Sequence, residues 1–106
     1  MITISKQLIV PADQEDKRKK LTAQLRKHRP SLRTVYCVIL PTTDGGILEV
    51  IPLYALRLEA RDHDVTVLAV SEGKNPALEL VESMIGEVYR ETGGFDVQSY
   101  YLKENA

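Results

Sequence analysis

The 106-residue sequence contains a single cysteine, Cys37, and no apolar run long enough to cross a bilayer. One cysteine excludes an internal disulfide framework and a cysteine-based zinc finger, because both need several thiols. A membrane span needs about 18 consecutive apolar residues, and no stretch approaches that length. Six glycines, five prolines, 43% hydrophobic residues and 27% charged residues exclude collagen-like, low-complexity and disordered chains. The length suits one domain with its own core, so we expect a single domain over residues 1–106.

The first ten residues lack the features of a secretory signal. No basic segment precedes the apolar residues, and no small-residue cleavage site follows them. A lone free cysteine also suits a reducing compartment. We therefore expect a cytoplasmic protein with no membrane contact.

The net charge of −1 hides a division along the chain. Residues 1–33 hold nine Lys or Arg and three Asp or Glu, a net charge of +6, whereas residues 34–106 hold five and twelve, a net charge of −7. No acidic residue lies between Lys17 and Arg33. Such a segment is typical of an anion-binding surface or of a face that docks on an acidic partner.

The first half of the chain predicts a strand, a helix and a second strand. Residues 2–10 alternate loosely and predict a strand, and Asp13 is a plausible N-cap for a helix over residues 14–28. The apolar side of this helix is thin, with only Leu21 and Leu25, which predicts that Leu21→Ala costs less stability than Ile85→Ala. Residues 34–40 are apolar on both faces and predict a central strand covered on both sides.

The second half is less uniform. The Asp-Gly-Gly turn at residues 44–46 predicts a hairpin, and the alternation over residues 47–60 favours one long strand bent at Pro52. A short helix over residues 53–61 is the alternative, because Leu, Ala, Arg and Glu are good helix formers. We also expect a strand over residues 65–70, and a last strand over residues 95–102.

A second helix lies between those last two strands in the predicted order. Asn75 is its expected N-cap, Pro76 its first residue and Gly93 the residue that ends it. The predicted order is therefore β-α-β-β-β-α-β, an α+β fold with two helices on one face of a mainly antiparallel sheet. Without one middle strand it becomes β-α-β-β-α-β, so a ferredoxin-like variant is suspected.

The basic segment 17–33 supplies the strongest candidate site. Its cations projecting away from Leu21 and Leu25, or lying beyond the helix, are Lys19, Lys20, Arg26, Lys27, Arg29 and Arg33. Such a row can neutralise phosphates. Against a dedicated nucleic-acid binder, the segment has no aromatic residue for base stacking, and the pI is near 6.1.

Two further candidates are weaker. The loop over residues 71–76 joins a strand to a helix and offers Gly73, Lys74 and Asn75 to an anion, although it lacks the glycine pattern of a phosphate-binding loop. The aromatic side chains near the C-terminus are candidates for an interface, since aromatics are enriched there. They are Tyr89, Phe95, Tyr100 and Tyr101.

No motif favours catalysis, a metal or a cofactor. Cys37 lies within an apolar strand and predicts a core thiol, and the two histidines have no ligand spacing or catalytic neighbour. We expect a non-catalytic domain that associates with other proteins, as a homo-oligomer first of all, through a terminal strand edge and complementary charged faces. The alternatives are a nucleic-acid-associated protein using residues 17–33 and a small-ligand or anion sensor at residues 71–76.

Overall fold

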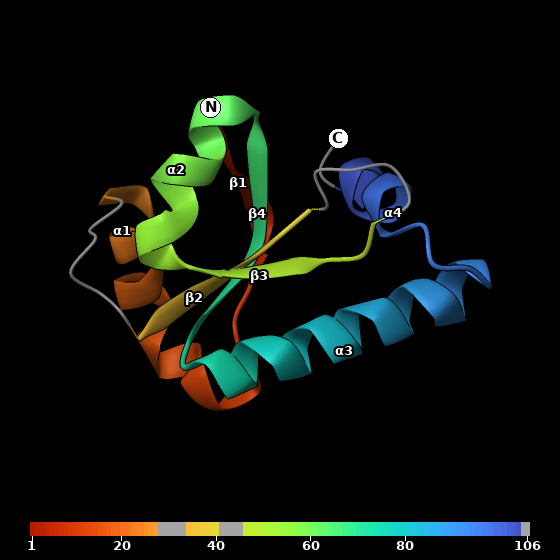
Figure 1. The fold of residues 1–106 in the computed structure, drawn as a ribbon. Coiled ribbons are helices and arrows are strands. Elements are labelled where there is room, and N and C mark those ends of the chain that lie inside the picture. Colours follow the sequence, from red (N-terminus) through yellow and green to blue (C-terminus); the bar gives the residue numbers. More distant parts are fainter. Residues whose placement is uncertain (28–33, 41–45, 105–106) are drawn as a thin grey trace.

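A four-stranded mixed sheet forms the centre of the fold in a computed structural model that describes residues 1–27, 34–40 and 46–104 (Figure 1). The elements run in the order β1 (Ile2–Ile9), 3₁₀ helix η1 (Ala12–Lys17), α1 (Arg18–Lys27), β2 (Val35–Ile39), β3 (Glu49–Pro52), 3₁₀ helix η2 (Leu53–Ala55), α2 (Leu56–Asp62), β4 (Val65–Glu72), α3 (Lys74–Thr92) and α4 (Val97–Glu104). This combination of a sheet with helices confirms the α+β class. None of the described helices is both long and apolar enough to cross a membrane.

The strands lie in the order β1-β4-β2-β3. β1 pairs with β4 in parallel, whereas β4 with β2 and β2 with β3 pair antiparallel, so the sheet is mainly antiparallel as predicted. β1 and β2 consequently run in opposite directions although α1 joins them. β1-α1-β2 is therefore not a parallel β-α-β unit. The parallel unit is β3-α2-β4, and β2 lies between β3 and β4 in the sheet. The ferredoxin-like order is therefore not confirmed.

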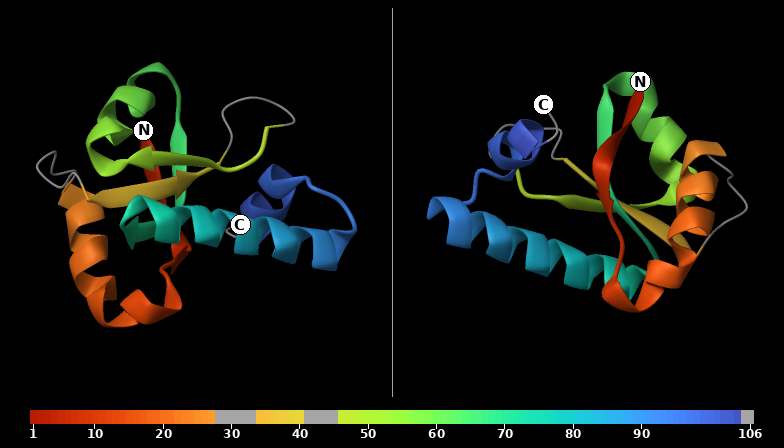
Figure 2. Two further views of the ribbon diagram at one scale, coloured as in Figure 1. Left: turned by 60° about the horizontal axis from the view of Figure 1, so that its bottom comes forward. Right: turned by 180° about the vertical axis from the view of Figure 1, so that it is seen from behind.

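Helices cover both faces of the sheet, so the prediction of two helices on one face is wrong (Figure 2). One core contains Leu21, Leu25 and Leu56 from α1 and α2, packed on the sheet. The other contains Met84 and Val88 from α3 and residues from α4. The reason lies in β2 and β4, which are apolar on both sides and need cover on both.

The last strand predicted over residues 95–102 is also wrong, because the chain there forms α4. Val97 and Tyr101 are four residues apart, so a helix places both on the side that faces α3, where both are buried. The Tyr101 hydroxyl donates to the carbonyl oxygen of Met84 at 3.3 Å.

The long strand predicted over residues 47–60 ends at Pro52. Residues 53–62 are helical, as the alternative interpretation had it, with Leu53 and Leu56 buried one turn apart. Proline ends the ladder because it has no backbone N–H to donate. The sheet thus has four strands rather than five. The hairpin between β2 and β3 agrees with the predicted turn, whose residues 44–45 lie outside the described part of the chain.

The predicted helix ends are partly corrected. α3 begins at Lys74 after Gly73, whose φ of 95° suits glycine, so Asn75 is not the cap and Pro76 lies inside the first turn. Gly93 ends α3 with φ 77° and donates its N–H to the Tyr89 carbonyl at 2.8 Å, as predicted. Asp13 does not cap the first helix, which begins as η1 after Pro11 without a side-chain cap.

Candidate functional site

The outer side of α1 carries a shallow basic groove. Leu21 and Leu25 are fully buried and fix which side of the helix faces the sheet. Residues at successive i, i+4 and i+8 positions then form one outward stripe. The groove is lined by Arg18, Lys19, Thr22, Ala23, Arg26 and Lys27. Thr22 and Ala23 are small and form the floor of the groove, and the long cationic side chains lie at its two ends.

Some basic residues of this region are already engaged. Arg18 forms a forked ion pair with Glu15, at 2.7 and 2.8 Å, and donates to the Leu8 carbonyl. This hydrogen bonding lowers the pKa of Glu15 and raises the pKa of Arg18. Lys17 lies 3.6 Å from the Glu72 carboxylate. These two cations serve to hold the helix on its own chain.

The other cations of α1 have no such partner. Lys19, Lys20, Arg26 and Lys27 are exposed, and none forms an ion pair or hydrogen bond with any residue in the described ranges. We call these four residues the basic face. Four uncompensated charges on a ten-residue helix produce a local positive potential.

Exposed acidic residues of α3 lie on the other side of the sheet from α1. α3 exposes Glu79, Glu82 and Glu91, and α3 covers the sheet face opposite α1 (Figure 2). The basic face of α1 and the exposed carboxylates of α3 therefore lie on opposite faces of the sheet. This separation explains how a positive face can exist in a chain whose pI is only about 6.1.

Two predicted members of the basic row, Arg29 and Arg33, lie outside the described residues, together with His28. The structure therefore brings together Lys19, Lys20, Arg26 and Lys27 and does not place the rest of the row.

The loop over residues 71–76 gives little support for anion binding. The Gly73 N–H donates to the Thr34 carbonyl at 2.6 Å, and the Ser71 hydroxyl donates to the Gly73 carbonyl at 2.8 Å. The hollow beside the start of α3 is lined by the carboxylates of Asp13 and Glu79. Carboxylates at this position disfavour an anion, so the assignment of Gly73, Lys74 and Asn75 remains a prediction.

The predicted aromatic cluster divides into two pairs. Tyr89 and Phe95 stack at the end of α3 with ring centres 5.2 Å apart, and they are 54% and 60% exposed. Tyr100 and Tyr101 meet edge to face at 5.0 Å, and Tyr101 is buried. Only the first pair offers a broad aromatic surface to a partner.

Residues with catalytic or ligand chemistry are dispersed. Cys37 is fully buried in β2, and burial raises its pKa to about 12, which confirms a core thiol. His63 lies 3.4 Å from Glu59, its neighbour one turn earlier. Within residues 1–27, 34–40 and 46–104, no group of three or more His, Cys, Asp or Glu side chains is placed to hold a metal ion.

Sequence reasoning did not single out Gln14, which is 7% exposed. Its side-chain amide donates to the Glu72 carbonyl at 2.9 Å and accepts from the Glu72 N–H at 2.8 Å, as a neighbouring strand would. The available signal was its place on the same side of the predicted helix as Leu21 and Leu25. Gln14 and Lys17 together fasten η1 to the end of β4 and thereby fix where α1 begins.

Comparison with protein families, curated proteins and solved structures gave no match. The functional proposals below accordingly rest on the geometry and charge of this chain.

Proposed function

We propose that this domain binds nucleic acid through the basic face of α1. The observation that carries the proposal is the set of four exposed cations, Lys19, Lys20, Arg26 and Lys27, which have no anionic partner in the described part of the chain. Lys17 and Arg18, by contrast, are paired with Glu72 and Glu15. Phosphates are the complementary ligands for an uncompensated row of this kind.

The dimensions of the face suit a phosphate backbone. Lys19 and Arg26 are seven residues apart, which is about 10 Å along a helix at about 1.5 Å per residue. Duplex DNA presents one charge per about 1.7 Å of its axis, so several phosphates fall within reach. The small residues Thr22 and Ala23 leave room for the backbone between the two cationic ends.

The ligand class follows from what the face lacks. The described residues of α1 include no aromatic side chain for stacking unpaired bases, so contact with a duplex backbone is favoured over single-strand binding. The acidic face of α3 repels nucleic acid from the opposite side and so orients the encounter.

Fluorescence anisotropy with a labelled duplex, between about 50 and 200 mM salt, tests the proposal. With up to about four phosphates neutralised, affinity should fall roughly 100-fold across this range. Changing Lys19, Lys20, Arg26 and Lys27 to Gln should abolish binding. The control carries the same charge change at exposed cations elsewhere: Lys6, Arg57, Arg61 and Arg90. Equal losses in the two variants, or no binding at the lowest salt, would refute it.

A second function, self-association, is favoured by the exposed stack of Tyr89 and Phe95. The basic and acidic faces lie on opposite sides of the sheet, so docking one on the other would build an open chain rather than a closed dimer. A two-fold dimer would instead bury the Tyr89–Phe95 pair on itself. Sedimentation should then show a dimer that Phe95→Ser dissociates and that Tyr54→Ser, at a 52% exposed aromatic elsewhere, leaves intact. A monomer at all concentrations would rule this function out.

A further inference from the structure

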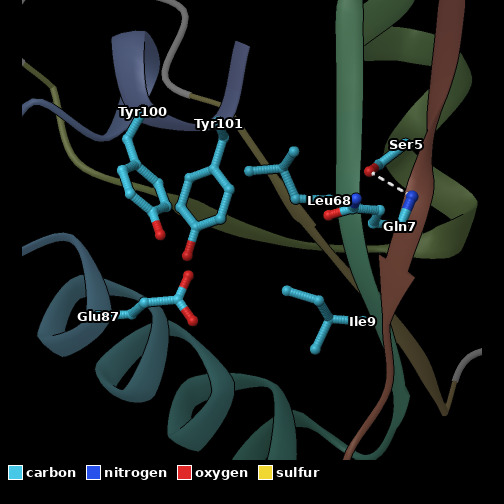
Figure 3. Close-up of a pocket in the computed structure, with 7 residues that line it drawn as sticks. All are labelled: Ser5, Gln7, Ile9, Leu68, Glu87, Tyr100 and Tyr101. Atoms are coloured by element: carbon cyan, nitrogen blue, oxygen red, sulfur yellow. Dashed lines mark hydrogen bonds between the residues drawn. The ribbon is translucent and has the colours of Figure 1, made fainter. Parts of the chain in front are cut away.

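A pocket of about 280 Å³ lies at one corner of the sheet, on the face covered by α3 and α4. α3 packs mainly against β4, β2 and β3, which leaves the outer strand β1 without a helix over it on this face. The pocket occupies that corner, between β1 on one side and α3 and α4 on the other (Figure 3).

Irregularities in two neighbouring strands shape this pocket. Ile4 lies opposite Val67 and Ile9 opposite Ala69, so β1 contains extra residues between them. β4 is also irregular here, because Val38 pairs with Ala69 and Ile39 with Val67, which leaves Leu68 as an extra residue. Bulges re-aim side chains and are over-represented next to functional sites.

The bulges deliver side chains of both strands to the pocket wall. Ser5, Gln7 and Ile9 come from β1, and Leu68 comes from β4. The Gln7 N–H donates to the Ser5 hydroxyl at 3.1 Å, which holds the bulged segment in shape. The wall on this side is therefore partly polar, with Ile9 and Leu68 as its aliphatic part.

The opposite wall consists of Glu87, Tyr100 and Tyr101. Figure 3 shows the carboxylate of Glu87 and the hydroxyl ends of both tyrosines directed toward the same region. Tyr101 is held by its hydrogen bond to the Met84 carbonyl, and Tyr100 meets it edge to face. The two rings are thus fixed beside the carboxylate before any ligand arrives.

Among the described residues that line the pocket, Glu87 is the only one with a formal charge. It is half-buried and makes no ion pair with any residue in the described ranges. Arg90, one turn further along α3, lies over Gly86 instead. Within the described part of the chain, the pocket therefore presents a negative charge without an ion-pair partner next to two aromatic rings.

We propose that this pocket binds a small organic ammonium compound. The Glu87 carboxylate would accept hydrogen bonds from the ammonium group, and the tyrosine hydroxyl oxygens, which point toward the same region, can accept as well (Figure 3). Ile9 and Leu68 would contact the aliphatic part of the ligand. A volume of about 280 Å³ lies at the lower end of small-molecule sites, so the ligand is small.

Titrations with butylammonium, 1-butanol and butyrate, followed by amide NMR shifts, test this proposal. The three probes share a four-carbon chain and differ in charge. Butylammonium at about 10 mM should shift the amides of Ser5, Gln7 and Tyr100. The alcohol and the carboxylate should bind at least about tenfold more weakly, because neither supplies a cation.

The variant Glu87→Gln should weaken butylammonium binding at least about tenfold. Glu82→Gln is the matched control, because it makes the same change on the exposed side of the same helix. Equal shifts with butanol and butylammonium, an unchanged affinity in Glu87→Gln, or an equal loss in Glu82→Gln would overturn the proposal. So would the absence of any pocket shift at about 10 mM probe. The unbound amide spectrum of each variant reports separately whether it is folded.

Discussion

Replacement of Gln14 by Leu should destabilise the protein by about 2 kcal/mol. The change keeps the side-chain volume nearly constant but removes two hydrogen bonds to Glu72, at 2.9 and 2.8 Å. It leaves the N–H and the carbonyl of Glu72 without these partners. An unsatisfied buried polar group costs about 1–3 kcal/mol. Both groups are partly buried, and the leucine gains some apolar burial, so the lower part of the summed range applies.

Gln24→Leu provides the matched control. It is the same substitution, made on α1, but the Oε1 atom of Gln24 is buried and has no hydrogen-bond partner among the described residues. Removing an unsatisfied polar atom is expected to leave the free energy of unfolding unchanged or to increase it. The two variants should therefore differ in direction or clearly in size.

Urea denaturation measures the difference. With a slope of about 1–3 kcal/mol per molar urea, Gln14→Leu should lower the midpoint by roughly 1 M. Gln24→Leu should lie close to the unmodified protein. If both variants shift the midpoint equally, the Gln14 amide does not fasten η1 to β4 in solution, and the reasoning fails.

Two other predictions concern the core. Leu21 is fully buried whereas Ile85 is half-buried, so Leu21→Ala should cost about 3 kcal/mol of stability and Ile85→Ala less. This order is the reverse of the one expected from the sequence. Urea midpoints that show a larger loss of stability for Ile85→Ala would contradict the prediction. Burial raises the pKa of Cys37 from 9.0 to about 12, so the unfolded chain loses this proton at a lower pH than the folded one and stability should fall as pH rises through that interval. Replacing Cys37 by Ala should remove this part of the pH dependence of stability. In the unmodified protein, a thiol reagent at neutral pH should react with Cys37 only as fast as the core opens.

Much of the secondary structure could be predicted from local patterns. Residues 2–9, 35–39 and 65–72 form the strands expected there, since β-branched runs favour extended backbone. The long helix α3 ends at Gly93 because a left-handed residue there satisfies a carbonyl of the last turn. The extended backbone of these strands and the end of α3 both depend on neighbouring residues and need no contact with distant parts of the chain.

The errors fall where short segments are compatible with both a helix and a strand. Residues 53–62 and 97–104 each place two buried residues on one helical side. Alternation in the sequence favoured a strand over residues 47–60, and a strand was also expected over residues 95–102. Burial against the sheet and against α3 decided between the two structures, and local propensity is too weak to do so.

The same division holds for the candidate sites. The sequence by itself determined that the cations cluster in residues 17–33 and that one amphipathic helix carries several of them, because both depend on order along the chain. Only the tertiary structure decided which cations remain unpaired, since Glu15 and Glu72 reach Arg18 and Lys17 but not Lys19, Lys20, Arg26 or Lys27. It also decided that basic and acidic helices lie on opposite faces and that the bulges of β1 and β4 meet beside Glu87. Those outcomes depend on strand register and on which side of the sheet each helix packs, and both are set by contacts between residues far apart in sequence.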